Sequence, residues 1–296
     1  MSTFTTRTNR QLHESKIEQN GEVFISRIEI INELPHYVNN IRGKKVYIPN
    51  TKKTLDLAQH DEFVKYFSTS STMNQYGIVE LKYSYYDEND NFVLFTIANG
   101  TIKKKVCNNN DNTRLSNVLR EIDTTDVVIG NPEGCKVNDL VWYIYGAKKD
   151  FILSVNKLFG GFKIAEILLN NDAISFGYNL PKKYYNVKNG KVENRGDMMW
   201  ITSFKNGNNP KIIETYYETR FHTYEKYDNY DAINVDCVKM IPMDYKGVMG
   251  VPVTNLPILN LNQFKIVGFR KGTDGKDLCI NGKCTHTRIL ISFRNN

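Results

Sequence analysis

Residues 126–156 read DVVIGNPEGCKVNDLVWYIYGAKKDFILSVN and hold the clearest structural pattern in the chain. Both ends, DVVIG (126–130) and DFILSVN (150–156), are short apolar runs that predict buried strands. The segment VNDLVWYIYGA (137–147) between them has the length and apolar content of a helix. A strand, a helix and a second strand in this order predict a βαβ unit, so both strands should lie in one sheet.

The same alternation extends beyond this unit on both sides. TRLSNVLREI (113–122) predicts a preceding helix, while GFKIAEILLNN (161–171) and AISFGYN (173–179) predict a following helix and strand. Together these elements predict an α/β fold with a mixed sheet and helices on both of its faces. Ligands in such sheets bind at the carboxyl ends of the strands, which is where Asn131 and Pro132 fall.

The flanking sequence predicts how the chain is organised. Upstream, helices are expected at 26–34 and 61–68, and strands at 44–49, 77–86 and 91–98. After residue 180 the pattern becomes β-rich, with hairpins at 182–194 and around Asn281-Gly282. The loop KNGNNP (205–210) is a candidate boundary. We therefore expect a mobile N-terminus at 1–15, an α/β core at 16–205 and a β-rich C-terminal segment at 206–296.

Positive charge is concentrated near the C-terminus. The net charge is +7, and residues 261–296 contain seven Lys or Arg against Asp274 and Asp277, a local net charge of +5. Clustered positive charge favours a polyanion such as DNA, with a solvated basic surface as the plainer alternative. The candidates for contact with DNA are Lys265, Arg270, Lys271, Lys283 and Arg288. A second basic run, Lys103-Lys104-Lys105, is typical of a solvated strand edge, with DNA contact as the alternative.

The cysteines and the apolar runs indicate the cellular compartment. Five cysteines without metal-ligand spacing predict reduced thiols in a cytoplasmic protein. Cys279 and Cys284 should face each other across a hairpin, but a metal site needs three or four ligands, so no metal is expected. Because no apolar run could span a membrane or act as a secretion signal, we expect a soluble protein.

Three segments of the C-terminal half carry a family pattern: KYDNYDAINVDCVKMIPMDYKGVMGVPVT (226–254), NQFKIVGF (262–269) and RILI (288–291). Through these segments, and most densely in the first, the C-terminal half resembles the EcoRI-type adenine-specific DNA methyltransferase family. The resemblance also covers 148–179 and WITSF (200–204). It implies a Rossmann-like fold of the S-adenosylmethionine (SAM) methyltransferase type. It further implies methylation of adenine N6 in double-stranded DNA, as in restriction–modification systems, with a C-terminal segment that contributes to DNA recognition.

The family's catalytic loop looks like Asn-Pro-Pro-aromatic at the end of a strand. Its Asn side chain and the following backbone carbonyl accept hydrogen bonds from the adenine amino group, and its ring stacks on the extruded base. Asn131 and Pro132 match this loop, whereas Glu133 replaces the second proline and Gly134 replaces the ring. The loop therefore loses rigidity and the stacking group, and it gains a carboxylate that repels DNA phosphate.

The resemblance also implies where SAM binds. The family's Asn-Asp-Glu-Phe-Tyr-Thr-like segment corresponds to NGEVFI (20–25), and its Asp-Asp-Pro loop corresponds to a longer loop in VYIPNTKKTLDLAQHDEFVKYF (46–67). The candidate cofactor-binding residues are Asn20, Glu22, Phe24 and Asp56. Both segments depart from the family pattern, so the differences fall on the methyl-donor site as well as on the target-base site.

Three hypotheses follow from this distribution of differences. The favoured one is a degenerate, catalytically inactive relative that acts as a DNA-binding or protein-interaction module, with no SAM required. The second is an active SAM-dependent adenine-N6 DNA methyltransferase in which Trp200, Tyr143 or Tyr178 supplies the missing ring. The third is an assembly subunit, in a phage or mobile-element setting, with a protein partner and no DNA role.

Overall fold

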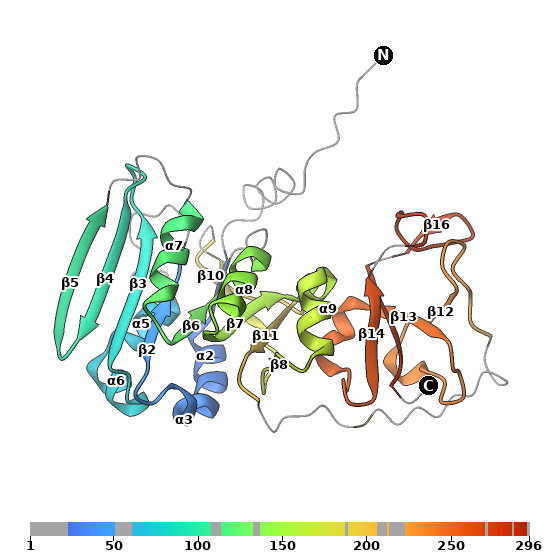
Figure 1. Cartoon of the computed structure of the whole chain (residues 1–296), viewed down its shortest axis with the longest axis horizontal. Helices are drawn as coiled ribbons and strands as arrows, with labels where there is room; N and C mark the ends of the chain where they lie inside the picture. The colour runs from blue at the N-terminus through green and yellow to red at the C-terminus, as the bar shows by residue number, and fades with distance from the viewer. Residues whose placement is uncertain are drawn as a thin grey trace, which may run out of the picture. The chain divides into compact units, whose positions relative to one another are not determined.

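The chain forms two compact units. A computed structural model describes residues 23–50, 61–107, 114–132, 137–186, 189–205, 212, 223–269, 272–285 and 287–294. The first unit comprises Met1–Val155 and Gly177–Phe204, and the second comprises Asn156–Phe176 and Lys205–Asn296. The chain therefore enters the second unit twice, first with Asn156–Phe176 and again after Phe204 (Figure 1).

The first unit is built from strands and short helices. Its strands are β1 (Val23–Ile25), β2 (Lys45–Ile48), β3 (Glu80–Tyr86), β4 (Phe92–Ala98), β5 (Thr101–Cys107), β6 (Val127–Gly130), β7 (Asp150–Asn156), β9 (Lys183–Asn186), β10 (Lys191–Asn194) and β11 (Met198–Thr202). Its helices are α2 (Arg27–Glu33), η1 (Leu34–Tyr37), α3 (Val38–Ile41), α5 (Glu62–Phe67), α6 (Ser70–Tyr76), α7 (Arg114–Asp123) and α8 (Val137–Gly146). Among the described helices, none is long and apolar enough to cross a membrane.

The main sheet confirms the predicted mixed α/β fold. Its eight strands run in the order β5-β4-β3-β2-β6-β7-β11-β8, where β8 is Ser175–Phe176. Strands β3, β2, β6 and β7 pair in parallel, whereas β4 and β5 add to β3 as antiparallel strands. Every residue of β6 is buried, as expected for a central strand that is covered on both faces.

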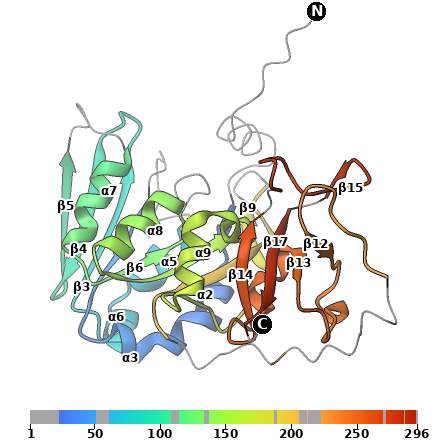
Figure 2. The same cartoon turned by 45° about the vertical axis from the view of Figure 1, so that its right-hand side comes forward.

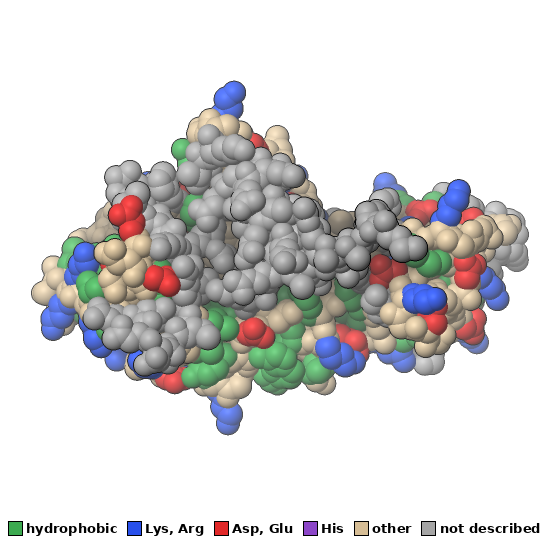
Figure 3. Space-filling view, turned by 90° about the horizontal axis from the view of Figure 1, so that it is seen from above, with side chains coloured by type: hydrophobic (Ala, Val, Ile, Leu, Met, Phe, Trp, Pro, Cys, Tyr) green, Lys and Arg blue, Asp and Glu red, His purple; other side chains and the backbone are tan. Residues whose placement is uncertain are grey.

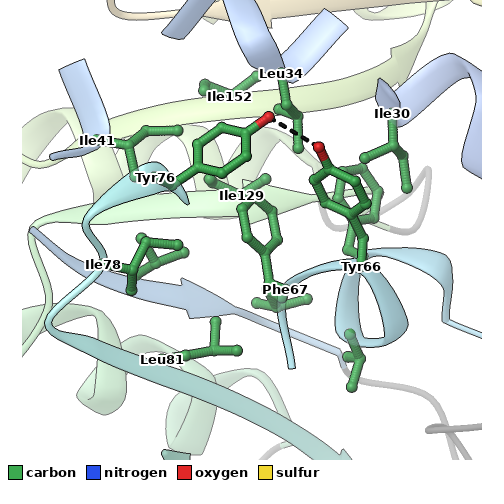
Figure 4. Packing of buried hydrophobic residues seen from close by; sticks show 14 of the residues in the cluster. Ile30, Leu34, Ile41, Tyr66, Phe67, Tyr76, Ile78, Leu81, Ile129 and Ile152 are labelled. Atoms are coloured by element: carbon green, nitrogen blue, oxygen red, sulfur yellow. Dashed lines mark hydrogen bonds between the residues drawn. The ribbon is translucent and has the colours of Figure 1, made fainter. Parts of the chain in front are cut away.

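One face of the sheet is covered by the short helices of the N-terminal half. Ile129 of β6 and Ile152 of β7 share a buried cluster with residues of α2, η1, α3, α5 and α6. Figure 4 shows Tyr66 and Tyr76 pointing toward each other within this cluster, and their hydroxyl groups are 3.0 Å apart. The pairing lets two tyrosines contribute large apolar surfaces to the core while their buried hydroxyl groups keep a hydrogen-bond partner.

Helices α7 and α8 cover the opposite face of the main sheet. The side chains of β3 that alternate away from the cluster bond to Tyr47 of β2 or to α7. Asn117 of α7 donates to the Tyr86 hydroxyl at 3.1 Å, and Lys82 pairs with Glu121 of α7 at 3.0 Å. Residues of α8, among them Val141 and Ile144, are fully buried. The prediction of helices on both faces is confirmed (Figure 1).

Strand β5 lies at the edge of the main sheet and confirms the interpretation of Lys103-Lys104-Lys105 as a solvated strand edge, although the bounds of the strand were not predicted. All its side chains from Thr101 to Val106 are exposed, including Lys103, Lys104 and Lys105. Because neither face of an exposed edge strand is selected for burial, its sequence lacks the alternation that identifies a half-buried strand. The lysines carry positive charge along this edge, which discourages pairing with a strand of another chain.

A buried carboxylate joins α2 to the segment that follows β8. Glu33 is fully buried, and it accepts hydrogen bonds at 2.8 Å from the Tyr37 hydroxyl and from the backbone N–H groups of Tyr178 and Asn179. Gly177 permits this approach, because a Cβ atom there would lie 2.4 Å from Oε1 of Glu33. Burial raises the pKa of Glu33, and these hydrogen bonds only partly oppose that shift.

The second unit contains a four-stranded sheet in the order β12-β13-β17-β14 (Figure 2). The strands are β12 (Ala232–Asn234), β13 (Val248–Pro252), β14 (Phe264–Phe269) and β17 (Arg288–Phe293), with a separate hairpin of β15 (Cys279–Ile280) and β16 (Lys283–Cys284). The helices are η3 (Lys157–Gly161), α9 (Lys163–Asn170), η5 (Val238–Met240) and η6 (Val253–Ile258). The β-rich character predicted for the C-terminal segment is confirmed.

Helix α9 docks on the outer strand of this sheet through one amide. The Asn170 side chain donates to the carbonyl of Ile266 at 2.8 Å and accepts from its N–H at 3.0 Å. The bidentate contact satisfies both backbone groups of an edge residue beside the irregularity between Ile266 and Gly268. Gly161 allows η3 to lie close by, since a Cβ there would overlap the ring of Phe269.

The first expected outcome concerns Glu33 and pH. Because its pKa is raised in the folded protein, its contribution to stability is full below its ordinary value of about 4.3 and is lost as pH rises through the raised value. We expect Glu33→Gln to become progressively less destabilising, relative to the wild type, as pH rises from about 4. Denaturant unfolding across a pH series measures this difference.

Glu88→Gln, on the exposed turn after β3, removes the same formal charge and controls for net charge. A constant difference in the free energy of unfolding between Glu33→Gln and wild type at every pH would contradict the expectation.

The second expected outcome concerns Arg288 of β17. Arg288 is 8% exposed, and its guanidinium pairs with Asp236. We expect Arg288→Ala to lower the free energy of unfolding by about 1.5–3 kcal/mol, because hydrogen bonds to charged groups have this net worth. Lys265→Ala, on the exposed side of β14, should stay within about 0.5 kcal/mol of wild type. Equal unfolding midpoints for the two variants would show that the Arg288 pair does not stabilise the fold.

Candidate active site

The strand order of the main sheet reverses between β2 and β6. From β2 the chain continues to β3 on one side of it, and it later returns through β6 on the other side. The connection after β2 therefore leads to β3 on one side, and the connection after β6 leads to β7 on the other side. In open α/β sheets such a reversal of strand order leaves space for a ligand at the carboxyl ends of the strands.

The two strands at this reversal end together. Val46 of β2 lies opposite Val127 of β6, and Tyr47 lies opposite Val128. Strand β2 ends at Ile48 and β6 at Gly130, so the residues that follow emerge from the same edge of the sheet. Continuing the parallel register brings Asn50 to the level of Asn131.

A close backbone approach keeps these two ends together. A Cβ atom at Gly130 would lie 3.8 Å from Cδ of Pro49, which places the end of β6 in van der Waals range of the residue after β2. Asn50 is 9% exposed, whereas Asn131 and Pro132 are half-buried. The more buried amide of Asn50 and the more exposed amide of Asn131 thus lie at the same edge of the sheet, after the ends of two buried strands.

The polar groups at this edge of the sheet can form hydrogen bonds with an amino group or with a zwitterion. Each asparagine side chain provides a carbonyl acceptor and an NH2 donor, and the backbone carbonyl of Pro132 is a further acceptor. Pro132 has no N–H, and its fixed φ limits the movement of the loop. Two adjacent carbonyl acceptors are the complement of an NH2 group. Glu133 and Gly134, predicted to continue the catalytic loop, lie outside the described residues.

Asn50 was missed by the sequence analysis. The signal that could have identified it is a polar residue immediately after a buried strand, the same signal that identified Asn131. Its significance depends on the pairing of β2 with β6, and these strands are about 80 residues apart in the chain. A hydrogen bond of 2.8 Å from the Lys45 N–H to Asp126, at the opposite ends of the same two strands, reflects that pairing.

Of the predicted cofactor-binding residues, only Phe24 is described. It lies on β1, opposite Tyr185 of β9, and its side chain is 7% exposed. Asn20, Glu22 and Asp56 lie outside the described residues. The role of all four residues in binding SAM stays a prediction.

The three rings considered as replacements for the missing stacking group all have contacts within the protein. Trp200 is fully buried, and its ring lies edge-on to Phe63 with centroids 6.0 Å apart. Tyr178 stacks on His36 at 4.1 Å, and the Tyr143 hydroxyl donates to Asp123 at 2.9 Å. A base could contact Trp200 only after repacking of the core, and the stacking role of these rings stays a prediction.

The residues predicted to contact DNA differ in their surroundings. Lys265 of β14 and Lys283 of β16 are exposed, whereas Arg288 is mostly buried and paired with Asp236. Arg270 and Lys271 lie outside the described residues. On the face drawn in Figure 3, the Lys and Arg side chains of the described residues are scattered among Asp and Glu rather than gathered in one patch. In the part of the chain that the structure describes, no cluster of three or more His, Cys, Asp or Glu could hold a metal ion.

Comparison with known proteins identifies the family. The family model for the adenine-specific methyltransferase EcoRI matches residues 95–292. The type II methyltransferase M.EcoRI of Escherichia coli is 30% identical over an alignment of 324 residues, which covers 96% of both chains. Relatives from Mycoplasma genitalium (M.MgeORF184P) and Mycoplasma pneumoniae (M.MpnI), also named type II methyltransferases, are 24% and 23% identical and cover 94% and 96% of this chain. No solved structure gave a significant match.

These relationships overturn the hypothesis of an inactive protein. The hypothesis rested on short motifs, yet the similarity to named methyltransferases covers 94–96% of the chain. The physical reason for the error is that the differences at Glu133 and Gly134 leave Asn131 and Pro132, which carry the acceptor groups, in place. From the match over residues 95–292 and the 30% identity across nearly its full length, the chain belongs to the EcoRI adenine-specific methyltransferase family.

Proposed function

We propose that the protein is an active, SAM-dependent DNA methyltransferase that methylates N6 of adenine. Membership of the family implies SAM as methyl donor and DNA as substrate. The observation that carries the proposal to this chain's own residues is the position of Asn131-Pro132. They follow β6 at the carboxyl edge of the parallel strands, beside Asn50 and at the reversal of strand order.

The proposed role of Asn131 and Pro132 is to bind and orient the amino group of the target adenine. The lone pair of that nitrogen is delocalised into the ring, which makes the amino group a weak nucleophile. Two carbonyl acceptors, the Asn131 side chain and the Pro132 backbone, engage both N–H bonds and direct the lone pair out of the base plane. Because the target atom is inaccessible inside a duplex, the base has to be extruded to reach this edge.

The residues at the end of β2 fit the cofactor. The methionine end of SAM carries an ammonium and a carboxylate group, and the Asn50 amide can accept from the first or donate to the second. When bound, SAM supplies a methyl group on a positively charged sulfur. The predicted contacts from Asn20, Glu22, Phe24 and Asp56 would complete the site. Placement on two buried strands fixes the distance between the cofactor side and the base side of the crevice.

Glu133 and Gly134 belong to the proposed loop because they follow Pro132 directly. Gly134 has no side chain, so it leaves room beside the extruded base for a ring from another part of the chain. Base–aromatic stacking tolerates different rings, since it depends on the π-face rather than on a specific hydrogen bond. Glu133 would lie next to a polyanion, so we expect it to weaken DNA binding rather than to promote it.

For DNA binding we propose Lys265, Lys283, Arg270 and Lys271 as phosphate contacts, with Arg288 acting mainly through the fold. The exposed ammonium groups of Lys265 and Lys283 support this choice, because an exposed lysine can release bound counterions from DNA phosphate. Arg288 already pairs with a carboxylate, and contact with phosphate would require that pair to break.

The third expected outcome tests the catalytic loop. Asn131→Ala removes one of the two acceptors for the amino group, and we expect methyl transfer from labelled SAM to DNA to fall by about 100-fold or more. Quantification of N6-methyladenine in the product identifies the modified atom. The thermal stabilisation produced by SAM should persist in the variant, since the change lies on the base side of the site.

Asn39→Ala, an exposed asparagine on α3, serves as the matched control and should keep wild-type activity. Full activity of Asn131→Ala would remove the loop from the mechanism. If wild-type protein neither binds SAM nor methylates DNA of mixed sequence, the proposed function itself is wrong.

The fourth expected outcome tests the DNA contacts. Replacing Lys265 and Lys283 together by Ala should weaken binding about equally for all DNA sequences. It should also reduce the slope of log K against log salt by about 0.9 for each lysine. Lys163→Ala is the control, because Lys163 is exposed but already paired with Glu166. An unchanged salt slope in the double variant would exclude both lysines as phosphate contacts.

A further inference from the structure

The β15–β16 hairpin of the second unit brings two cysteines face to face. Cys279 lies directly opposite Cys284, and Ile280 opposite Lys283, across the two-residue turn Asn281-Gly282. Both turn residues have positive φ, 49° and 71°, as a tight hairpin turn of this type requires. The pair next to the one that closes such a turn is the non-hydrogen-bonded pair, whose Cα atoms are about 4.5 Å apart. This separation lies within the range that a disulfide spans.

The two sulfur atoms are already close. The distance between Sγ of Cys279 and Sγ of Cys284 is 2.7 Å, so a bond of about 2.05 Å needs only a small movement of either side chain. Cys284 is exposed and Cys279 is half-buried, so a reagent in solution reaches Cys284 more readily. Cys237 is also exposed and provides a comparison within the same unit.

The hairpin is held in place by the segment before β12. The carboxylate of Asp228 accepts hydrogen bonds from the N–H groups of Asn281 at 3.1 Å and Gly282 at 2.8 Å. The Asn229 side chain accepts from the N–H of Cys279 at 3.2 Å. These contacts hold β15 and the turn in place, so less conformational entropy remains to be lost when the sulfur atoms join.

The contact between the two sulfur atoms affects the ionisation of Cys279. The hydrogen bond with Cys284 raises the pKa of Cys279 to about 11. Cys279 is therefore protonated near neutral pH. Since the thiolate is the nucleophile in thiol–disulfide exchange, the accessible Cys284 is the group that attacks first.

We propose that Cys279 and Cys284 form a reversible dithiol–disulfide site that is oxidised by small-molecule disulfides of the glutathione type. The Cys284 thiolate attacks one sulfur of the small disulfide, forms a mixed disulfide and releases one thiolate. Cys279 then loses its proton and attacks Sγ of Cys284, which forms the protein disulfide and expels the second small thiolate. Two protein thiols are oxidised and one small disulfide is reduced to two thiols, so atoms and electrons balance.

Neither cysteine is among the residues proposed at the ends of β2 and β6, but Lys283, a proposed phosphate contact, lies between them in the hairpin. The new bond would close a ring around Ile280, Asn281, Gly282 and Lys283. Such a bond is rare in reducing compartments and, where it occurs, typically serves redox sensing.

The test uses the full-length reduced protein, which has five cysteines. After incubation with oxidised glutathione and removal of excess reagent, wild type should lose two titratable thiols and two hydrogen atoms in mass. Peptide mapping should link Cys279 to Cys284, and dithiothreitol should restore all five thiols. Cys237→Ser should lose the same two thiols. Cys284→Ser should form no internal bond at this hairpin.

A second measurement tests the pairing without oxidation. A trivalent arsenical such as phenylarsine oxide bridges two neighbouring thiols, so wild type and Cys237→Ser should each retain one equivalent through gel filtration, and Cys284→Ser should retain none. Retention of all five thiols with oxidised glutathione would overturn the proposal. So would a product with only glutathione adducts, or a disulfide that joins any other pair.

Discussion

The parallel pairing of β2 with β6 is the constraint on which the candidate site depends. These strands are separated by about 80 residues, and β3, β4, β5 and α7 come between them along the chain. Their register makes them end at the same level. Asn50 and Asn131 have no relation in sequence, yet the pairing places both at one edge with buried strands behind them. A change that shifted this register would separate the two amides without altering either residue.

The layers on the two faces of the sheet support that pairing by different means. On one face an apolar cluster that includes Ile129 and Ile152 packs under the short N-terminal helices. On the other face buried apolar residues such as Val141 and Ile144 are supplemented by polar contacts, as in the bond from Asn117 to Tyr86 and the pair of Lys82 with Glu121. Apolar packing tolerates small shifts, whereas directional bonds do not. The polar contacts between α7 and β3 therefore fix the position of α7, the element that precedes β6 in the chain.

Local sequence was sufficient where burial imposes a pattern, and insufficient where it does not. Strands β6 and β7 and helix α8 were predicted because their apolar runs reflect burial. The bounds of β5 were not predicted, because every residue up to Val106 is exposed and only its lysine run indicated a strand edge. At the site, Asn131 was found from the strand that precedes it, but Asn50 needed knowledge of which strand lies beside β2. Glu33 looked like an ordinary helical carboxylate, because its partners Tyr178 and Asn179 lie far along the chain.

The mistaken inference of inactivity came from giving equal weight to every part of the loop motif. A backbone carbonyl and one amide at a fixed position are hard to replace, because they act through directed hydrogen bonds to a single atom. A stacking ring acts through area and can be contributed from a different element, and a second proline only adds stiffness. In this chain the two groups of the first kind remain, at the end of a strand whose every residue is buried. The differences at Glu133 and Gly134 affect groups of the second kind. Loss of the literal motif is therefore weaker evidence against catalysis than retention of the acceptors at the reversal of strand order is evidence for it.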